Sequence, residues 1–214
     1  MRFNDRTQAG QVLAGMLRGL EGQDCTVLAI PNGGVPVGIE IARGLRAPLG
    51  VEIVRKLQIP GNTEAGFGAQ TSRGDIILNQ ILVKALRLGP EPVRTIAATT
   101  MQEITRRKAL FGAAEQIIEG RTVILTDDGL ASGFTMVAAA RSVRRRGPKS
   151  LIVAVPTAPE PSIGRVEKVA DRVVCPNIRR TRSFAVADAY EDWYDLITEE
   201  AAELFREWQR TKNP

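Results

Sequence analysis

Residues 123–136 read V-I-L-T-D-D-G-L-A-S-G-F-T-M, and this stretch decides the expected fold. Its first residues are apolar or β-branched and predict a buried strand over 122–126. The residues from Phe134 onward predict a helix over 134–146. Between the two, a pair of aspartates and a run of small residues form a turn that breaks both patterns. A strand that leads through such a turn into a helix is typical of a parallel α/β sheet.

The same alternation of strand and helix continues on both sides of this stretch. The predicted strands are apolar throughout instead of alternating with polar residues, which indicates burial on both faces. We therefore expect an α/β fold: a doubly wound, mostly parallel sheet with helices on both faces. The further strands are expected over 26–30, 49–54, 151–155 and 172–175, and the further helices over 7–20, 35–45, 91–110, 161–170 and 198–209.

Two parts of the chain fit such a sheet less well. Residues 65–70 and 76–78 flank a Thr-Ser-Arg-Gly turn and predict a hairpin. The stretch from 177 onward, together with residues 1–20, is expected to supply a hood beside the sheet. A chain of 214 residues suits one domain, so we predict a single domain over 1–214 with these two additions.

The composition limits the class of protein. Hydrophobic residues make up 43% and charged residues 25%, which is ordinary for a globular protein with a core. Two cysteines, Cys25 and Cys175, are too few for a disulfide scaffold or a zinc ribbon, so we expect free thiols. No apolar run reaches the ~18 residues of a membrane helix, and no signal-peptide pattern follows Met1. We expect a cytoplasmic protein without a membrane partner.

The absence of histidine narrows the possible chemistry. It excludes Ser-His-Asp and Cys-His catalysis and all metal sites built on histidine. Catalysis would have to use carboxylates, cations, backbone amides or a hard metal ion held by oxygen. The net charge of +5 comes mostly from arginine, which suits bidentate binding of phosphate and equally suits surface ion pairs.

The turn after the strand at 122–126 carries the clearest chemical pattern. Small residues at a helix start expose backbone N–H groups and bind anions, and Ser132 and Thr135 add hydroxyl donors. Asp127 and Asp128 would bind vicinal hydroxyls or the waters of a hard cation. A ribose 5-phosphate fits this combination. The alternative is that both aspartates are turn and cap residues. The sequence contains neither a Walker A loop nor a G-x-S-x-G motif.

The stretch 123–136 resembles the phosphoribosyl pyrophosphate (PRPP) signature of the type I phosphoribosyltransferases. That signature has four apolar residues, two acidic residues and a small, threonine-rich turn. Residues 29–36, A-I-P-N-G-G-V-P, resemble the pyrophosphate loop of the family. Val54-Arg55-Lys56 resembles the basic end of its second strand, before a mobile loop that we place at 59–63. The similarity extends over about residues 1–195.

The resemblance implies an Mg²⁺-dependent transfer of 5-phosphoribose from PRPP to a nitrogenous acceptor, with a nucleobase of purine or pyrimidine salvage expected. Asp127 and Asp128 would hold the ribose hydroxyls, and Arg55 and Lys56 would stabilise the pyrophosphate that leaves. PRPP itself would supply most of the Mg²⁺ ligands, with no direct protein ligand and the two aspartates nearby. A homodimer is expected. Substrate binding is assigned to Asn32, Gly33, Gly34, Gly129, Leu130, Ala131, Ser132, Gly133, Phe134 and Thr135.

Three residues depart from the pattern of similar sequences. Asn32 stands where an arginine is common, so a cation near the pyrophosphate is missing from the loop. Ser132 replaces a common threonine, which is a mild change. Phe134 replaces a small residue, and its ring must point away from the phosphate or it narrows the site.

The acceptor site and the basic runs stay open on sequence alone. Phe184, Tyr190 and Trp193 either stack on a base or belong to the core. The arginines of 144–146 and 179–182 either contact nucleic acid or lie on solvated faces, and we do not expect nucleic acid as a partner. The alternative function is a PRPP-responsive regulatory protein that binds RNA or DNA. A metal-dependent phosphate-ester hydrolase is less favoured, because the D-x-D spacing is missing.

Overall fold

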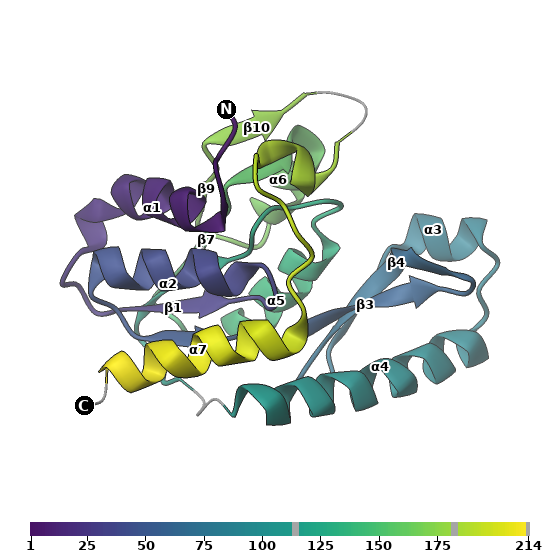
Figure 1. Ribbon diagram of the computed structural model, residues 1–214. Coiled ribbons are helices and arrows are strands. Elements are labelled where there is room, and N and C mark those ends of the chain that lie inside the picture. Colours follow the sequence, from purple (N-terminus) through teal and green to yellow (C-terminus); the bar gives the residue numbers. More distant parts are fainter. Residues whose placement is uncertain (113–115, 181–183, 213–214) are drawn as a thin grey trace.

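A five-stranded parallel sheet forms the centre of the computed structural model, which describes residues 1–112, 116–180 and 184–212 (Figure 1). Its strand order is β2-β1-β6-β7-β9, and all neighbouring strands run parallel. The predicted parallel α/β sheet is confirmed. The strands are β1 (Cys25–Ala29), β2 (Leu49–Val51), β6 (Thr122–Thr126), β7 (Ser150–Ala154) and β9 (Arg172–Val174).

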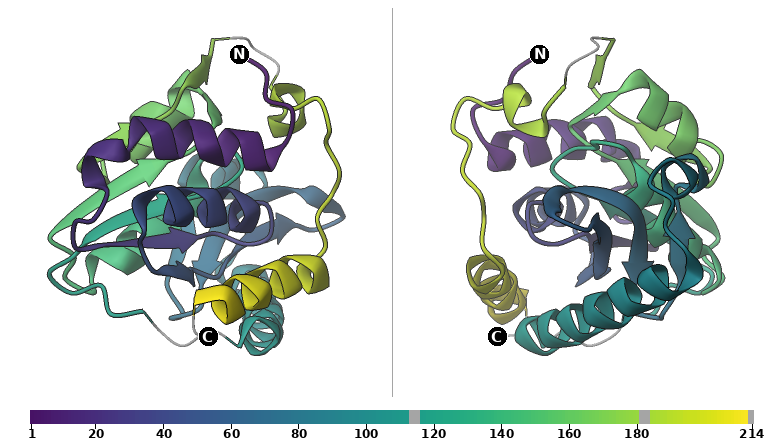
Figure 2. Two further views of the ribbon diagram at one scale, coloured as in Figure 1. Left: turned by 60° about the vertical axis from the view of Figure 1, so that its left-hand side comes forward. Right: turned by 90° about the vertical axis from the view of Figure 1, so that its right-hand side faces the viewer.

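Successive residues of the strands point into two different hydrophobic cores. Val27 and Ile124 belong to the first core, whereas Leu28 and Leu125 belong to the second. Alternate side chains of a strand face opposite sides of a sheet, and both sides are covered here, which explains the continuously apolar strands. Figure 2 shows this layering from two further sides. The first core includes residues of α1 (Arg6–Met16), α2 (Gly34–Leu45) and α7 (Thr198–Lys212), and the second includes residues of α5 (Phe134–Arg144) and α6 (Glu160–Val166).

The direction of winding reverses between β1 and β6. From β1 the chain passes through α2 to β2 at one edge, and from β6 it passes through α5, β7 and α6 toward β9 at the other. Because such crossovers are right-handed, the helices of the two halves lie on opposite faces. The carboxyl ends of β1 and β6 therefore flank a topological switch point, where α/β sheets bind ligands.

The prediction of one strand over 49–54 is wrong, because the chain leaves the parallel sheet after Val51. Glu52 lies at the break: its N–H still donates to the Ala29 carbonyl of β1 at 2.9 Å, and its buried carboxylate accepts from Ser142 Oγ at 2.8 Å. A new strand, β3 (Val54–Ile59), then pairs antiparallel with β4 (Asn62–Thr71). The loop expected over 59–63 is therefore only a tight turn between these two strands.

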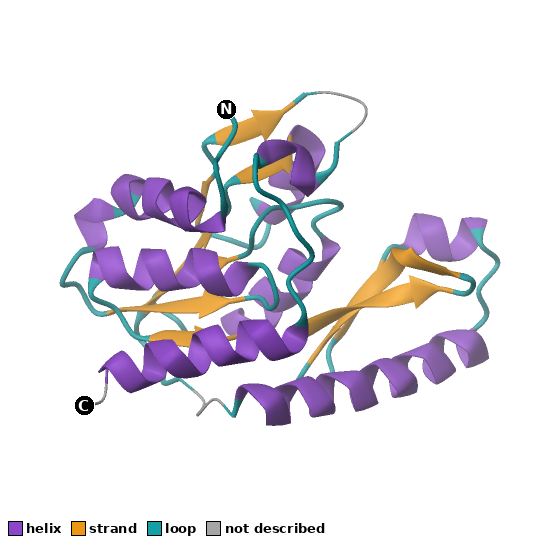
Figure 3. Ribbon diagram, in the orientation of Figure 1, coloured by secondary structure: helices purple, strands orange, loops and turns teal. Residues whose placement is uncertain are grey.

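An arm extends from the body beyond this break, as Figure 1 and Figure 3 show. It contains the predicted hairpin, in which β4 pairs with β5 (Ile76–Leu78). Two helices follow, α3 (Gln80–Ala85), which the sequence patterns did not predict, and α4 (Pro90–Phe111). The arm has a small core of its own around Leu57, Phe67 and Ala97, and α4 leads the chain back to the body.

The hood lies above the sheet and is smaller than expected. β8 (Thr157–Pro159) pairs parallel with β10 (Asn177–Arg179), and the short helix η2 (Val186–Ala189) follows. Near the N-terminus, Phe3 forms a β-bridge with Tyr190. The helices α1, with η1 (Arg18–Leu20) after it, and α7 pack instead against α2.

Two expectations from the composition can be compared with the described residues. Cys25 and Cys175 are both free thiols, as predicted, the first buried and the second half-buried. No helix in the described part of the chain is both long and apolar enough to span a bilayer.

Candidate active site

A cavity of about 230 Å³ lies at the switch point between β1 and β6. Residues from four segments line it: the end of β1, the start of β3, the loop after β6 and the hood. It brings Arg55 and Lys56 together with Asp127 and the turn of residues 129–135, up to 80 positions away along the chain. Asn32, Gly33, Gly34, Asp128 and Phe134, which were also predicted to belong to the site, are not among its lining residues. The lining residues are Ile30, Pro31, Val54, Arg55, Lys56, Asp127, Gly129, Leu130, Ala131, Ser132, Gly133, Thr135, Met136 and Val186.

The small-residue turn is held in place from the side of α6. Ser162 Oγ donates to the Ala131 carbonyl at 2.6 Å, and the Arg165 guanidinium donates to the Ser132 carbonyl. Gly133 caps α5 with a φ of +79°, which favours glycine at this position. The first amides of a helix have no partner within the helix, so the turn offers N–H groups to an anion.

The Phe134 ring lies outside the lining of the cavity, as an open anion site requires. The Arg165 guanidinium lies over the ring at 4.8 Å from its centre, so the ring faces α6. The aromatic side chain therefore does not narrow the anion site.

The two aspartates are not equivalent. Asp127 lines the cavity, and its Oδ1 accepts the N–H of Asp128 at 2.8 Å. Asp128 Oδ2 instead accepts from Arg6 Nε at 2.9 Å, in an ion pair whose side chains are only 15% and 8% exposed. Burial raises the pKa of both carboxyls, and the charge of Asp128 raises that of Asp127 further, whereas Arg6 opposes the rise at Asp128.

Two of the aromatic residues considered for base stacking, Tyr190 and Trp193, contact Asp128 and Arg6. The Tyr190 side chain is 1% exposed, and its hydroxyl donates to the Asp128 carbonyl at 2.6 Å. Of the two alternatives for Tyr190, the core position is confirmed, and the alternative that it stacks on a base is wrong. The Trp193 ring stacks on the Arg6 guanidinium at 4.0 Å. Of the three aromatic candidates, Phe184 lines a separate hollow of about 540 Å³ that shares Ala131 and Ser132 with the cavity.

The segment from 191 to 197 connects η2 with α7 and fastens the two ligand loops; we call it the strap (Figure 1). Its Tyr194 carbonyl accepts from Arg6 Nη1 at 3.0 Å, and its Leu196 carbonyl accepts from Asn32 Nδ2 at 2.8 Å. The loop after β1 and the loop after β6 are thus both tied to one segment of the chain.

The residues of the predicted pyrophosphate loop have different surroundings. Pro31 lines the cavity, and its peptide bond to Asn32 is cis. The Asn32 side chain points to the strap and to α4, where Arg107 Nη1 donates to its Oδ1 at 2.8 Å. A side chain at Gly33 would come within 1.8 Å of Asp128 Oδ2, so the neighbouring carboxylate itself requires this glycine. Gly34 is the first residue of α2.

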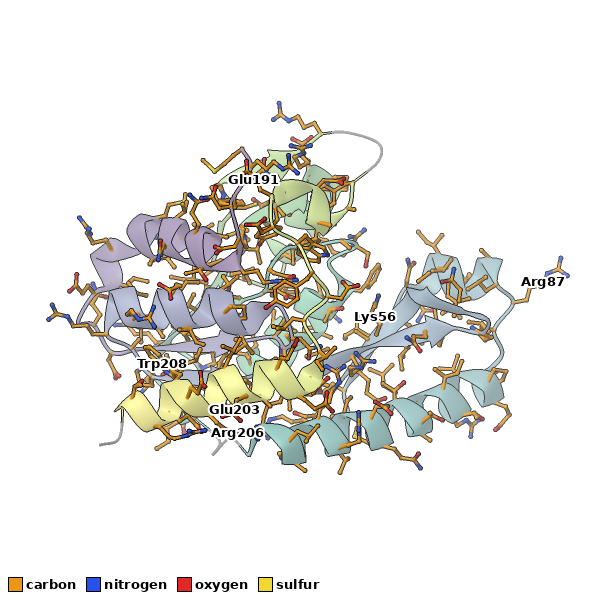
Figure 4. All side chains as sticks on the ribbon, viewed as in Figure 1. Lys56, Arg87, Glu191, Glu203, Arg206 and Trp208 are labelled. Atoms are coloured by element: carbon orange, nitrogen blue, oxygen red, sulfur yellow. The ribbon has the colours of Figure 1, made fainter. Side chains whose placement is uncertain are left out.

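Arg55 and Lys56 both line the cavity, but they do not precede a mobile loop in the way expected. They lie in β3, where they pair with Gln70 and Ala69 of β4. Figure 4 shows Lys56 where β3 joins the arm to the body. Burial lowers the pKa of Arg55, because the charged guanidinium loses part of its hydration.

The basic runs take part in ion pairs with nearby carboxylates. Arg144 pairs with Asp171 at 2.5 Å, Arg145 with Asp75, and Arg146 with Glu52 at 3.4 Å. In the second run, Arg180 pairs with Glu160 at 3.2 Å, whereas Arg182 lies outside the described residues. The pairs of Arg144, Arg145 and Arg180 support the interpretation as surface and helix-end cations, whereas the pair of Arg146 with Glu52 is largely buried.

Two contributions to the site were not predicted from the sequence. Arg6 is the first residue of α1, where a positive charge is unfavourable because the N-terminal end of the helix dipole is also positive. This unfavourable position could have indicated that Arg6 has an acidic partner elsewhere in the fold. Arg107 lies near the end of α4 in a run of three cations, 106–108, and nothing local distinguishes it from its neighbours. Its contact with Asn32 spans 75 positions of the chain.

The donor set fits a metal ion that is held mainly by a substrate. Among the described residues, no group of three or more acidic or cysteine side chains could hold a metal alone. Asp127 is nevertheless a carboxylate that faces the cavity, and burial, followed by the negative charge of Asp128, raises its pKa. Oxygen ligands of this kind suit Mg²⁺, which commonly takes one or two carboxylates plus substrate phosphates.

Comparisons with known proteins agree on the family. The family model described as "Phosphoribosyl transferase domain" matches residues 7–192. The Mycobacterium tuberculosis H37Rv protein "Putative phosphoribosyl transferase Rv0571c" is 36% identical over 200 residues, which are 92% of this chain and 45% of that protein. This chain thus spans less than half the length of the curated relatives it matches.

Solved structures give the same result. The crystal structure of TT1426 from Thermus thermophilus superposes with a TM-score of 0.79 at 34% identity, over 97% of this chain and 99% of that one. The AQ2163 protein of Aquifex aeolicus, at 11% identity and a TM-score of 0.51, covers 81% of this chain and 74% of its own, and it supports the fold alone. The chain therefore belongs to the phosphoribosyl transferase family, as the resemblance of residues 123–136 predicted.

Proposed function

We propose that the cavity binds PRPP and that the protein transfers its 5-phosphoribosyl group to a nitrogenous acceptor, first of all a nucleobase, with release of pyrophosphate. The observation that carries this proposal is the convergence of an anion-binding turn, the carboxylate of Asp127 and the cations Arg55 and Lys56 on one cavity. Each of these groups matches a different part of PRPP. Membership of the family supports the same reaction.

The 5-phosphate would lie at the turn of residues 131–135, where backbone amides and the hydroxyls of Ser132 and Thr135 donate to it. The ribose hydroxyls would bind Asp127, and Asp128 would accept a second hydroxyl while it keeps its ion pair with Arg6. A carboxylate has about four acceptor sites, so the two contacts of Asp128 are compatible.

In the reaction, the acceptor nitrogen bonds to C1 of the ribose as the bond from C1 to the pyrophosphate oxygen breaks. The bonding electrons leave with pyrophosphate, and the acceptor N–H proton passes to the leaving pyrophosphate or to water. Positive charge develops on the ribose, and the negative charge of the Asp127 carboxylate stabilises it. Arg55 and Lys56 neutralise the leaving group. Mg²⁺, when bound, would neutralise further negative charge on pyrophosphate; PRPP itself would supply most of its ligands, with Asp127 nearby.

The acceptor would enter beside the hood. Val186 of η2 lines the cavity itself, and Phe184 lines the adjoining hollow of about 540 Å³. An apolar side chain and an aromatic ring suit a flat heterocyclic base, which buries its faces and leaves its edges for hydrogen bonds. Purine and pyrimidine bases are therefore the first acceptors to try. The homodimer and the cytoplasmic location stay predictions.

The test has two steps. The first measures PRPP binding by calorimetry with and without Mg²⁺, and we expect tighter binding with the metal. The second measures pyrophosphate release with a panel of purine and pyrimidine bases, and we expect turnover with at least one. No PRPP binding with Mg²⁺ present would refute the proposal. Binding without turnover for any base would support a PRPP-responsive regulatory protein instead, which a salt-dependent RNA and DNA binding assay then tests.

A further inference from the structure

We infer that Arg107 is a positioning residue for the pyrophosphate end of the substrate: from α4, and through Asn32, it orients the loop of residues 31–34 and brings a positive charge to it. The inference rests on the proposed function and concerns which residue serves the pyrophosphate. The loop itself reads P-N-G-G and contains no cationic side chain.

The contact between Arg107 and Asn32 is specific in its geometry. Arg107 Nη1 donates to Asn32 Oδ1 at 2.8 Å, and Asn32 Nδ2 donates to the Leu196 carbonyl at 2.8 Å. An amide side chain has one accepting and one donating end, so these two partners allow a single orientation. The loop after β1 is thereby held between α4 and the strap.

Arg107 is also buried and incompletely paired. The residue is 9% exposed, and its Nε atom is buried without a hydrogen-bond partner. No carboxylate among the described residues forms an ion pair with it, although Glu103 and Glu199 are close enough to favour its charge. A buried guanidinium is costly unless an anion compensates it. This burial is expected of a cation that serves a bound anion.

A second cation lies on the cavity side of the same loop. Arg55 lines the cavity together with Pro31. Burial and then the positive charge of Arg55 lower the pKa of Arg107 to about 10. The buried guanidinium of Arg107 and the half-buried one of Arg55 repel each other, and an anion at the loop relieves the repulsion. Arg55 from β3 and Arg107 from α4 would thus share the charge of one pyrophosphate.

Arg107 would stabilise the leaving pyrophosphate more than it stabilises intact, bound PRPP. Negative charge on pyrophosphate increases as its bond to C1 breaks, and a fixed cation in a buried site acts strongly on such a change. Arg107 needs no direct contact for this effect, because the Asn32 amide connects it to the loop that would hold the anion.

The test compares two variants that remove the same charge from adjacent positions of α4. Arg107→Gln removes the buried cation, and Arg106→Gln removes one whose side chain is 63% exposed. Inorganic pyrophosphate and ribose 5-phosphate are titrated separately into each protein. We expect Arg107→Gln to weaken pyrophosphate binding at least 10-fold and to leave ribose 5-phosphate within twofold. Arg106→Gln should leave both within twofold.

A merely structural role of Arg107 would give a different result. Equal weakening of both ligands, or unchanged pyrophosphate binding in a folded Arg107→Gln, would overturn the inference. If Arg107→Gln does not fold, Arg107→Met takes its place, because it fills a similar length without an unpaired buried donor. A wild-type protein that binds ribose 5-phosphate but not pyrophosphate would overturn this inference alone, whereas binding of neither ligand would also overturn the proposed function.

Discussion

The substitutions Asp127→Asn and Asp128→Asn should have different effects. The first should lower the activity, and the second should lower the stability of the fold. Asp127→Asn removes a carboxylate that faces the cavity and keeps its size and its acceptor for the Asp128 N–H. A hydrogen bond to a charged group contributes about 1.5–3 kcal/mol, so kcat/KM for PRPP should fall about 10- to 150-fold. Folding should not suffer, because an ionised, buried Asp127 beside a second carboxylate costs stability at neutral pH.

Asp128→Asn should instead lower the stability. It leaves the Arg6 guanidinium, only 8% exposed as a side chain, without its counter-charge. Breaking a buried ion pair costs about 3–5 kcal/mol, and we expect about 2–3 kcal/mol here because the asparagine oxygen still accepts from Arg6. For a chain of this length, such a loss lowers the melting temperature by about 5–10 °C.

The assay combines melting curves with steady-state kinetics in which PRPP is varied, at a temperature where every variant is folded. The double asparagine variant should lose at least about 100-fold in kcat/KM, or about 2.7 kcal/mol. A folded Asp127→Asn variant with near-normal kcat/KM would refute the ribose-binding role and leave the pair as turn and cap residues. An unchanged melting temperature for Asp128→Asn would refute the structural part of the reasoning.

Other parts of the site give four further predictions. Tyr190→Phe leaves the buried Asp128 carbonyl without its donor and should lower the free energy of unfolding by about 1–3 kcal/mol in urea titrations; no loss would contradict the contact. Lys56→Ala should lower kcat and keep the PRPP dissociation constant within about threefold, because the ammonium group would act on the charge that develops on the leaving pyrophosphate; weak binding with normal kcat would reverse this role. Crystals soaked in ribose 5-phosphate should show the anion at residues 131–135, and binding only elsewhere would count against the turn. Activity should fall as the pH drops through the pKa of Asp127, which burial raises above the ordinary value of about 3.9, and Asp127→Asn should lose this acid limb.

The sheet and the anion turn could be predicted because their signals are local. The strand at 122–126, the turn and the helix from Phe134 follow one another in the sequence, so a single stretch of 14 residues contains the whole pattern. The buried strands were identifiable because a parallel sheet covered on both faces leaves no polar alternation. Family resemblance then connected the turn with the loop at 31–34.

The remaining features depend on contacts between distant parts of the chain. At the break in the predicted strand 49–54, Glu52 accepts a hydrogen bond from Ser142 on α5, a partner 90 positions away that no local pattern indicates. The ion pair of Arg6 with Asp128 spans 122 positions, and periodicity carries no information on such a pair. Tyr190 was ambiguous for the same reason, since a core position and a stacking position have the same residue type and spacing.

The strap has a consequence for the order in which the protein is made. The turn after β6 leaves the ribosome well before residues 194 and 196, whose carbonyls fix Arg6 and Asn32. Until then, Arg6 and Asn32 lack their hydrogen bonds to the strap, even if the sheet beneath the loops at 31–34 and 127–135 has already formed. A nascent chain would therefore complete its ligand site only after residue 196 has been made.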